Sequence, residues 1–245
     1  MENNEYSTPD YINTIFNSFV ELKGDRKSGD DNTVKAGLGR INNEKFVVIE
    51  YKSNKESNHF GLPNSDGYRK SLRLMDMAET FDKPVIIITD ITEFHVLSAP
   101  YQQKNDEFLA KVQEKMVNLR VPIIAIIAGT YNSFFSLELC AVDRILIFDH
   151  SIFMFPFHQT SDFAEPSQLE IKQIKAQELL NLNIVDKIIF SSIDGDLNQI
   201  SNKLRKDIQG EFQQIKQLDS KSLIEQRLNK IQARFLGYKK MMSEI

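Results

Sequence analysis

The sequence predicts an α/β fold with a largely parallel sheet and an all-helical C-terminal part. Two apolar runs, residues 84–89 and 121–128, are bounded by proline, glycine or aspartate. Their length suits strands that are buried on both faces. Each run follows a segment whose apolar residues recur at helical spacing, and the last fifty residues show helical spacing only. Helices and strands therefore alternate through the middle of the chain, and helices close it.

The N-terminal part is predicted to form a helix followed by a hairpin. Thr8 and Pro9 suit the start of a helix over residues 9–22, with Gly24 at its end. Two β-rich runs follow a polar loop, and the tight turn Asn42-Asn43-Glu44 joins them. The remaining elements are predicted as helices over 68–81, 102–119, 133–142, 167–182, 197–218 and 220–238, and strands over 84–89, 121–128, 145–148, 152–155 and 184–190.

Composition limits the classes of function. The 245 residues can bury one sizeable core, and no linker or low-complexity segment divides them, so we expect a single domain. The net charge of −4 disfavours a nucleic-acid partner. The single cysteine, Cys140, fits a reducing compartment, and the polar, acidic N-terminus shows no signal peptide. We expect a cytoplasmic protein without a membrane segment.

The turn after residues 121–128 is the first candidate for chemistry. Gly129 allows a sharp turn, and a helix beginning at Ser133 would point backbone N–H groups into a cleft, where they stabilise an oxyanion. The segment is bulky for this role, and Ser133 lacks the flanking glycines of a hydrolase elbow. The four histidines share no metal-ligand spacing, so no metal site is predicted.

A group of cations is the second candidate. Arg69, Lys70 and Arg73 follow the turn Asp66-Gly67 at the start of a predicted helix, where positive charge opposes the helix dipole. An anionic ligand, such as a phosphate, a carboxylate or the acids of a partner, would explain them. The alternative is a solvated face whose long side chains cover apolar surface.

The same stretch carries a family resemblance. Residues 58–75, NHFGLPNSDGYRKSLRLM, resemble the N-F-G-x-P-x-P-E-G-Y-R-K-A-L-R-L-M signature of the α subunit of bacterial acetyl-CoA carboxylase carboxyltransferase. The likeness covers about residues 8–235 in order, and the chain is identified as a divergent member. It includes FVELKGDRKSGDD at 19–31, the strands at 34–41 and 142–148, the segments 119–128 and 175–189, and Glu225-Gln226-Arg227.

The resemblance implies a crotonase/ClpP-like superhelix of stacked ββα units, with a core at about 25–190, an N-terminal helix at 9–22 and C-terminal helices at 196–240. It also implies an α2β2 heterotetramer with a β-type subunit, which carries the zinc. The reaction would move a carboxyl group from carboxybiotin on a biotin carrier protein to acetyl-CoA, giving malonyl-CoA for fatty acid biosynthesis. Carboxybiotin and acyl-CoA would be substrates, and no cofactor would be bound directly.

The resemblance also implies the site residues. An oxyanion hole for the ureido oxygen of biotin falls on the turn Gly129, Thr130, Tyr131, Asn132, Ser133, Phe134 and Phe135. Substrate binding falls on Asp66, Gly67, Tyr68, Arg69, Lys70, Arg73 and Asp90.

Three site loops depart from the family pattern. The turn G-E-G-G-S-G-G-A keeps only Gly129 and Ser133, D-T-P-G-A-Y-P-G keeps only Asp90, and S-P-E-G is replaced by residues 156–159. Bulky side chains where glycines are expected suggest a degraded site. The alternatives are a working subunit, a subunit for a non-standard acyl-CoA, and an inactive paralogue that scaffolds or regulates a β-type partner. Enoyl-CoA hydration needs two paired glutamates, and nothing pairs Glu93 with Glu138.

Overall fold

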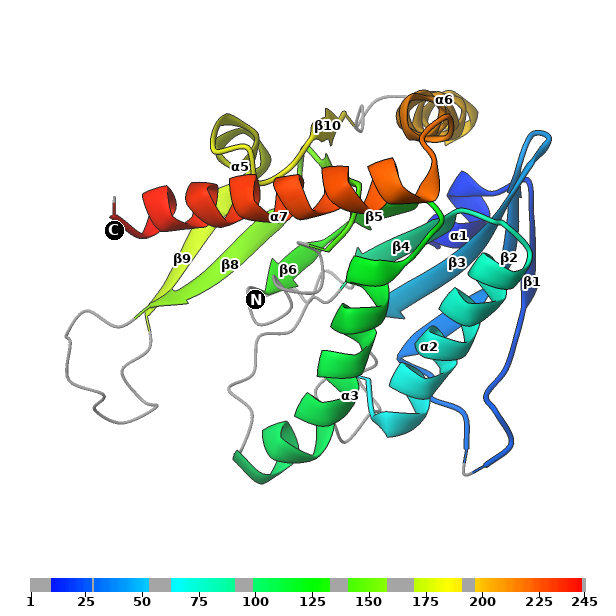
Figure 1. Cartoon of the computed structure of the whole chain (residues 1–245). Coiled ribbons are helices and arrows are strands. Elements are labelled where there is room, and N and C mark those ends of the chain that lie inside the picture. Colours follow the sequence, from blue (N-terminus) through cyan, green and yellow to red (C-terminus); the bar gives the residue numbers. More distant parts are fainter. Residues whose placement is uncertain are drawn as a thin grey trace, which may run out of the picture.

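The computed structural model describes residues 10–27, 29–52, 63–90, 99–132, 141–157, 170–190 and 197–243. Its main sheet has seven strands in the order β1-β2-β3-β4-β5-β7-β10, and a second sheet has the order β6-β8-β9 (Figure 1). Strands β1 to β3 are antiparallel, whereas β3, β4, β5, β7 and β10 run parallel. The main sheet comprises β1 (Ser18–Glu21), β2 (Val34–Ile41), β3 (Glu44–Lys52), β4 (Val85–Asp90), β5 (Ile123–Ile127), β7 (Arg144–Phe148) and β10 (Lys187–Ile189), and the second comprises β6 (Thr130–Asn132), β8 (Ile152–Phe157) and β9 (Glu170–Lys175).

Helices cover both faces of the main sheet. Along β4, the side chains of Val85 and Ile87 belong to one hydrophobic cluster, and those of Ile86 and Ile88 belong to another. Helices α2 and α3 pack on the first cluster, and α1 and α6 pack on the second (Figure 1). Burial on both faces explains why the central strands are continuously apolar, and the predicted α/β fold with a parallel core is confirmed. The helices are α1 (Tyr11–Ile15), α2 (Ser65–Thr80), α3 (Ala99–Asn118), α5 (Ala176–Asn181), α6 (Leu197–Ile215) and α7 (Ser220–Ser243).

The helix predicted over residues 9–22 is wrong in its extent. Helix α1 has only five residues, and the Asp10 side chain caps it by accepting the N–H of Asn13 at 3.1 Å. The chain is extended at Phe16 and continues as β1, which pairs antiparallel with β2. The apolar residues over this range belong to a short helix and to the edge strand that follows it. The helical period of about 3.6 and the strand period of about 2 adjoin here and together resemble one longer helix.

The helix predicted over 167–182 is also wrong in its first part. Residues 170–175 form β9, which pairs antiparallel with β8, and only 176–181 are helical. Pairing along the whole length of β8 outweighs the weak helical pattern of EIKQIK. The helix predicted over 133–142 lies almost entirely outside the described residues.

Helix α7 is anchored by ion pairs between segments that are far apart in the sequence. The fully buried Arg227 donates from Nε and Nη2 to the two carboxylate oxygens of Asp143, at 2.9 and 2.8 Å. Its Nη1 donates to the carbonyls of Met116 and Leu119, at and just after the C-terminal end of α3. One helix of the tail thus ties β7 to the end of α3.

A second anchor lies two turns further along α7. Arg234 donates to Asp186 Oδ2 at 2.8 Å and to the carbonyl of Val142 at 2.7 Å, and Lys230 forms an ion pair with Asp186. Three motifs behind the family resemblance, at 142–148, 175–189 and 225–227, therefore meet in one network. Their first role is to hold the fold together.

Two helical glycines should respond oppositely to alanine. A Cβ added at Gly210 in α6 would meet no atom within 4 Å, whereas at Gly237 in α7 it would overlap the carbonyl oxygen of Leu182. Gly210→Ala should raise the free energy of unfolding by about 1 kcal/mol because alanine is the better helix former. Gly237→Ala should lower it by about 1–3 kcal/mol because α7 must move away. Urea unfolding measures both, and a stabilising Gly237→Ala would contradict this packing.

Candidate functional site

The predicted cation group at the start of α2 is bound to the chain's own loop at 23–34. Arg69 donates to Asp25 Oδ2 at 2.8 Å and to Asp66 Oδ1 at 2.6 Å. The buried Lys70 donates to the carbonyl of Val34 at 2.7 Å and forms an ion pair with Asp30. The hydrogen bond from Arg69 lowers the pKa of Asp25 to about 2.

The other predicted residues of this group also support α2. Arg73 donates to the carbonyl of Lys23, and Tyr68 is buried in the first hydrophobic cluster. A Cβ at Gly67 would lie 2.6 Å from Asp31 Oδ2, so glycine permits the close approach of this loop. Acids of the same chain supply the anionic partners of Arg69 and Lys70, and a role of these residues in substrate binding stays a prediction.

The chain passes from the large sheet to the small one at Gly129. Strand β5 ends at Ile127, and β6 then pairs parallel with β8, with Tyr131 opposite Phe153 and Asn132 opposite Met154. The predicted turn is thus a strand in its first part, and Ser133, Phe134 and Phe135 lie outside the described residues. None of Thr130, Tyr131 and Asn132 has a positive φ. The backbone there suits ordinary residues, so two of the family's glycines are replaced where the chain conformation does not require glycine.

Asp90 explains why a glycine stands at position 129. Asp90 is the last residue of β4, beside the end of β5, and its side chain is only 1% exposed. A Cβ at Gly129 would overlap Asp90 Oδ1. The carboxyl group therefore lies directly against the first residue of the predicted oxyanion turn.

Two buried carboxyl groups lie on this side of the sheet. Three of their oxygens, Asp90 Oδ1, Asp90 Oδ2 and Glu50 Oε1, have no hydrogen-bond partner among the described residues. Burial raises the pKa of Glu50 to about 7 and also raises the pKa of Asp90, while Lys52 opposes both shifts. Burial thus favours the neutral form of both acids relative to exposed carboxyl groups.

Tyr11 joins this group from α1, which packs on the same face of the sheet. Its hydroxyl donates to the carbonyl of Ala128 at 2.6 Å, which fixes the residue before Gly129. Burial and the nearby acids Asp90 and Glu50 raise the pKa of Tyr11. Sequence reasoning missed Tyr11 and Glu50. The signal for Glu50 was present, as one acid in the otherwise apolar run FVVIEY.

Glu50 should make the fold less stable at high pH. Its carboxyl is protonated in the folded state up to about pH 7 but ionises near pH 4.5 when unfolded. The unfolded state therefore binds fewer protons between these values, and the free energy of unfolding falls as pH rises through this window, by about 3 kcal/mol in total. Glu50→Gln should remove most of this slope in urea unfolding at pH 5, 6, 7 and 8. An unchanged slope would contradict the burial of a neutral Glu50.

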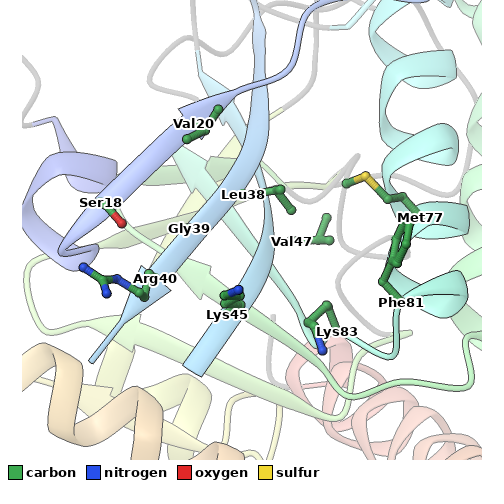
Figure 2. A pocket seen from close by; sticks show the side chains of 10 residues that line it. All are labelled: Ser18, Val20, Leu38, Gly39, Arg40, Lys45, Val47, Met77, Phe81 and Lys83. Atoms are coloured by element: carbon green, nitrogen blue, oxygen red, sulfur yellow. The ribbon is translucent and has the colours of Figure 1, made fainter. Parts of the chain in front are cut away.

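A groove of about 410 Å³ lies on another part of the surface (Figure 2). Val20, Leu38 and Val47 are cross-strand neighbours on β1, β2 and β3, and they face Phe81 beyond the end of α2. Val20 is 62% exposed and Phe81 63%. The rim carries three cations that form no ion pair within the described part of the chain, namely Arg40, Lys45 and Lys83. This is an uncovered apolar surface with a positive edge.

Metal clusters and membrane-spanning helices are absent from the described ranges. These ranges contain no group of three or more His, Cys, Asp or Glu residues placed to hold a metal ion. None of the helices they contain is long and apolar enough to cross a membrane.

Comparisons with known proteins show which family the chain resembles. The α subunit of acetyl-coenzyme A carboxylase carboxyl transferase from Clostridium perfringens (strain SM101 / Type A) is 32% identical over 243 residues, which cover 93% of this chain and 89% of that protein. The same subunit from Geobacter sulfurreducens is 30% identical, over 91% of this chain and 75% of that protein.

Solved structures share the fold at low identity. One chain of a Pseudomonas malonate decarboxylase hetero-tetramer in complex with coenzyme A matches with a TM-score of 0.64 at 10% identity, over 96% of this chain and 97% of that chain. The transcarboxylase 12S core matches with a TM-score of 0.59 at 14% identity, over 84% of this chain, which spans 40% of that longer chain. Enoyl-CoA hydratase/isomerase structures match too, so the predicted crotonase-type fold is confirmed. The model of the acetyl co-enzyme A carboxylase carboxyltransferase-like family matches residues 2–234, and the chain belongs to this family.

Proposed function

We propose that this chain is the α-type subunit of an acetyl-CoA carboxylase carboxyltransferase. With a β-type subunit, as an α2β2 assembly in the cytoplasm, it would move a carboxyl group from carboxybiotin on a carrier protein to acetyl-CoA. The product would be malonyl-CoA, the building unit of fatty acid biosynthesis. The match to the family over residues 2–234 is the observation that carries this proposal.

The geometry beside Gly129 supports a working site rather than a degraded one. Tyr131 and Asn132 replace family glycines, but they lie in β6, where the backbone has ordinary strand geometry. Backbone N–H groups are the donors of such an oxyanion hole, so side-chain replacement alone does not remove them. A buried, polar group around Asp90 also lies at this edge of the sheet.

The second candidate is an inactive paralogue that scaffolds or regulates a β-type partner. This inactive form is favoured by the bulky residues Tyr131, Phe134 and Phe135. They stand in the segment where a ligand would contact the backbone. A subunit adapted to a different acyl-CoA is the remaining form of the enzyme proposal, because bulky residues reshape a pocket without abolishing it.

Reverse transcarboxylation separates these candidates. The chain is purified together with the β-type subunit of its own genome, assembly is checked by light scattering, and malonyl-CoA-dependent carboxylation of biocytin is followed. Turnover well above that of each subunit alone supports the enzyme. An assembled complex with no turnover on malonyl-CoA or on a panel of substituted malonyl-CoA substrates overturns it and leaves the scaffold.

A further inference from the structure

One face of β2 passes from a covered end to a bare end. Val34 and Ala36 lie in the first hydrophobic cluster, on which α2 packs, and they are at most 1% exposed. Further along the same face, Leu38 is 40% exposed, and Arg40 is exposed as well. The layer formed by α2 and α3 therefore leaves the β1–β2 margin of this face uncovered. Because helices normally cover both faces of the sheet in such a domain, this margin is a place for one further helix.

The uncovered margin carries two rows of side chains. The register of the strands places three apolar residues side by side, and they form the apolar row, Val20, Leu38 and Val47. Two positions along each strand, and therefore on the same face, lies the basic row, which consists of Ser18, Arg40 and Lys45. Met77 of α2 and Phe81 beyond its end form the wall of the groove (Figure 2). An apolar floor and a positively charged end thus belong to one groove.

The basic row has no counter-charge within the groove. Arg40 and Lys45 are direct partners in the register of β2 and β3, and like charges in this position destabilise a sheet. Lys83 adds a third cation, and none of the ten residues that line the groove is an acid. The acid beside Lys45 in the sequence, Glu44, forms its ion pair with Lys216. An anionic partner would relieve the repulsion between these cations.

The occupant must offer apolar groups and carboxylates together. A small inorganic anion would leave the apolar row in water, and a second copy docked through the same groove by a twofold axis would bring cations to cations. An amphipathic helix meets both needs. The two rows lie about 6–7 Å apart along the strands, which is close to the rise of about 5.4 Å per helical turn. Carboxylates one turn from the apolar anchors therefore reach the basic row.

We propose that this groove binds an acidic amphipathic helix of a partner protein, which lies beside α2 and completes the helix layer over β1 and β2. Its apolar face covers the apolar row, and its carboxylates pair with Arg40, Lys45 and Lys83. Lys45 and Lys83 lie at the start of β3 and just before β4, whereas Asp90 and Gly129 follow the opposite ends of the parallel strands. The docked helix therefore leaves the candidate reaction site open, and this inference does not depend on the proposed function.

A designed peptide tests the chemistry of the groove. The probe is a synthetic helical peptide with leucines at one-turn spacing and glutamates one turn from them, and its control carries glutamines instead. Titration into the full chain with ¹³C-labelled methyl groups should shift the signals of Val20, Leu38 and Val47, and the control should bind about ten-fold more weakly. Equal affinity for the two peptides, shifts confined to other methyl groups, or displacement of the probe by equimolar dodecanoate would overturn the proposal.

Lys45→Glu separates binding from folding, because its effects on the two should have opposite signs. The new carboxylate would face Arg40 across the strands, so the urea midpoint of the free chain should rise. Affinity for the glutamate peptide should fall about ten-fold or more, because attraction is replaced by repulsion. Lys206→Glu, an exposed change on α6 across the sheet, should leave the affinity within about twofold. A Lys45→Glu chain that keeps full affinity would contradict the assigned role of the basic row.

Cross-linking in cells of the source organism tests whether such a helix occupies the groove there. A benzophenone amino acid replaces Phe81, and the control places it at Phe235 of α7, whose exposure of 65% matches the 63% of Phe81. Mass spectrometry of the product at position 81 should identify a segment of another protein with acids one turn from apolar residues. Lys45→Glu should remove this product, and position 235 should not give it. A lipid, a segment of this chain, a basic segment or no product at position 81 would overturn the proposal.

Discussion

Replacing Arg227 with methionine should lower the free energy of unfolding by about 3–5 kcal/mol. This is the largest stability effect that we expect from a single substitution in α7. Both Arg227 and Asp143 are fully buried, and the variant leaves the Asp143 carboxylate without its cation. The variant also removes the hydrogen bonds that Arg227 donates to the carbonyls of Met116 and Leu119 at the end of α3. Urea unfolding of the purified chain measures the loss.

Arg120→Met is the matched control for this prediction. Arg120 pairs with Glu79, but its side chain is largely exposed, so its loss should cost under about 1 kcal/mol. Combining Arg227→Met with Asp143→Asn should cost less than the sum of the single changes, because the unpaired charge is removed. Equal losses for Arg227→Met and Arg120→Met would show that the buried pair does not anchor α7.

Gly129→Ala should lower transcarboxylation by about 10²–10³-fold while the complex still assembles. The added Cβ would overlap Asp90 Oδ1, so either the carboxyl or the start of β6 must shift. Displacements of about 1 Å at a reacting site commonly cost two orders of magnitude in rate. Steady-state rates with malonyl-CoA and biocytin measure the effect.

Gly210→Ala controls for the substitution itself, because its Cβ enters open space far along α6. It should leave the rate within twofold of the wild type. If Gly129→Ala retained the full rate, the contact between Asp90 and Gly129 would not belong to the working site.

The sequence predicts the core of this fold well because its signals are local. The strands at 84–89 and 121–128 are recognisable from uninterrupted apolar runs, which only strands buried on both faces need. Helices α2 and α6 show one apolar stripe each, and their faces meet the sheet as expected. Here the local pattern and the tertiary burial agree.

The errors arise where pairing partners decide the structure. Strands β1 and β9 form because β2 and β8 offer them hydrogen bonds, and neither has an apolar pattern strong enough to reveal this locally. The partners of Arg69 and Lys70 are likewise set by the path of the 23–34 loop. From charge and spacing alone, these cations were expected either to bind an anionic ligand or to form a solvated face. Neither alternative includes the ion pairs that they form within the chain.

The sequence alone could predict only part of the arrangement around Gly129. Gly129 and Asp90 were both singled out, but their contact depends on β4 and β5 being neighbours with a particular register. Glu50 and Tyr11 come from β3 and α1, and only the fold brings them near these two residues. The spacing of residues in the sequence does not show which residues of different elements come into contact.

Transfer of an isotopic label tests the central claim most directly. Malonyl-CoA carrying ¹³C in its free carboxyl group is mixed with biocytin and the assembled complex, and carboxybiocytin is followed by NMR against each subunit alone. We predict that the label appears on biocytin at a catalytic rate only when both subunits are present. A stable complex of this chain with its β-type partner that leaves the label on malonyl-CoA would contradict the assignment of this chain as a working carboxyltransferase subunit.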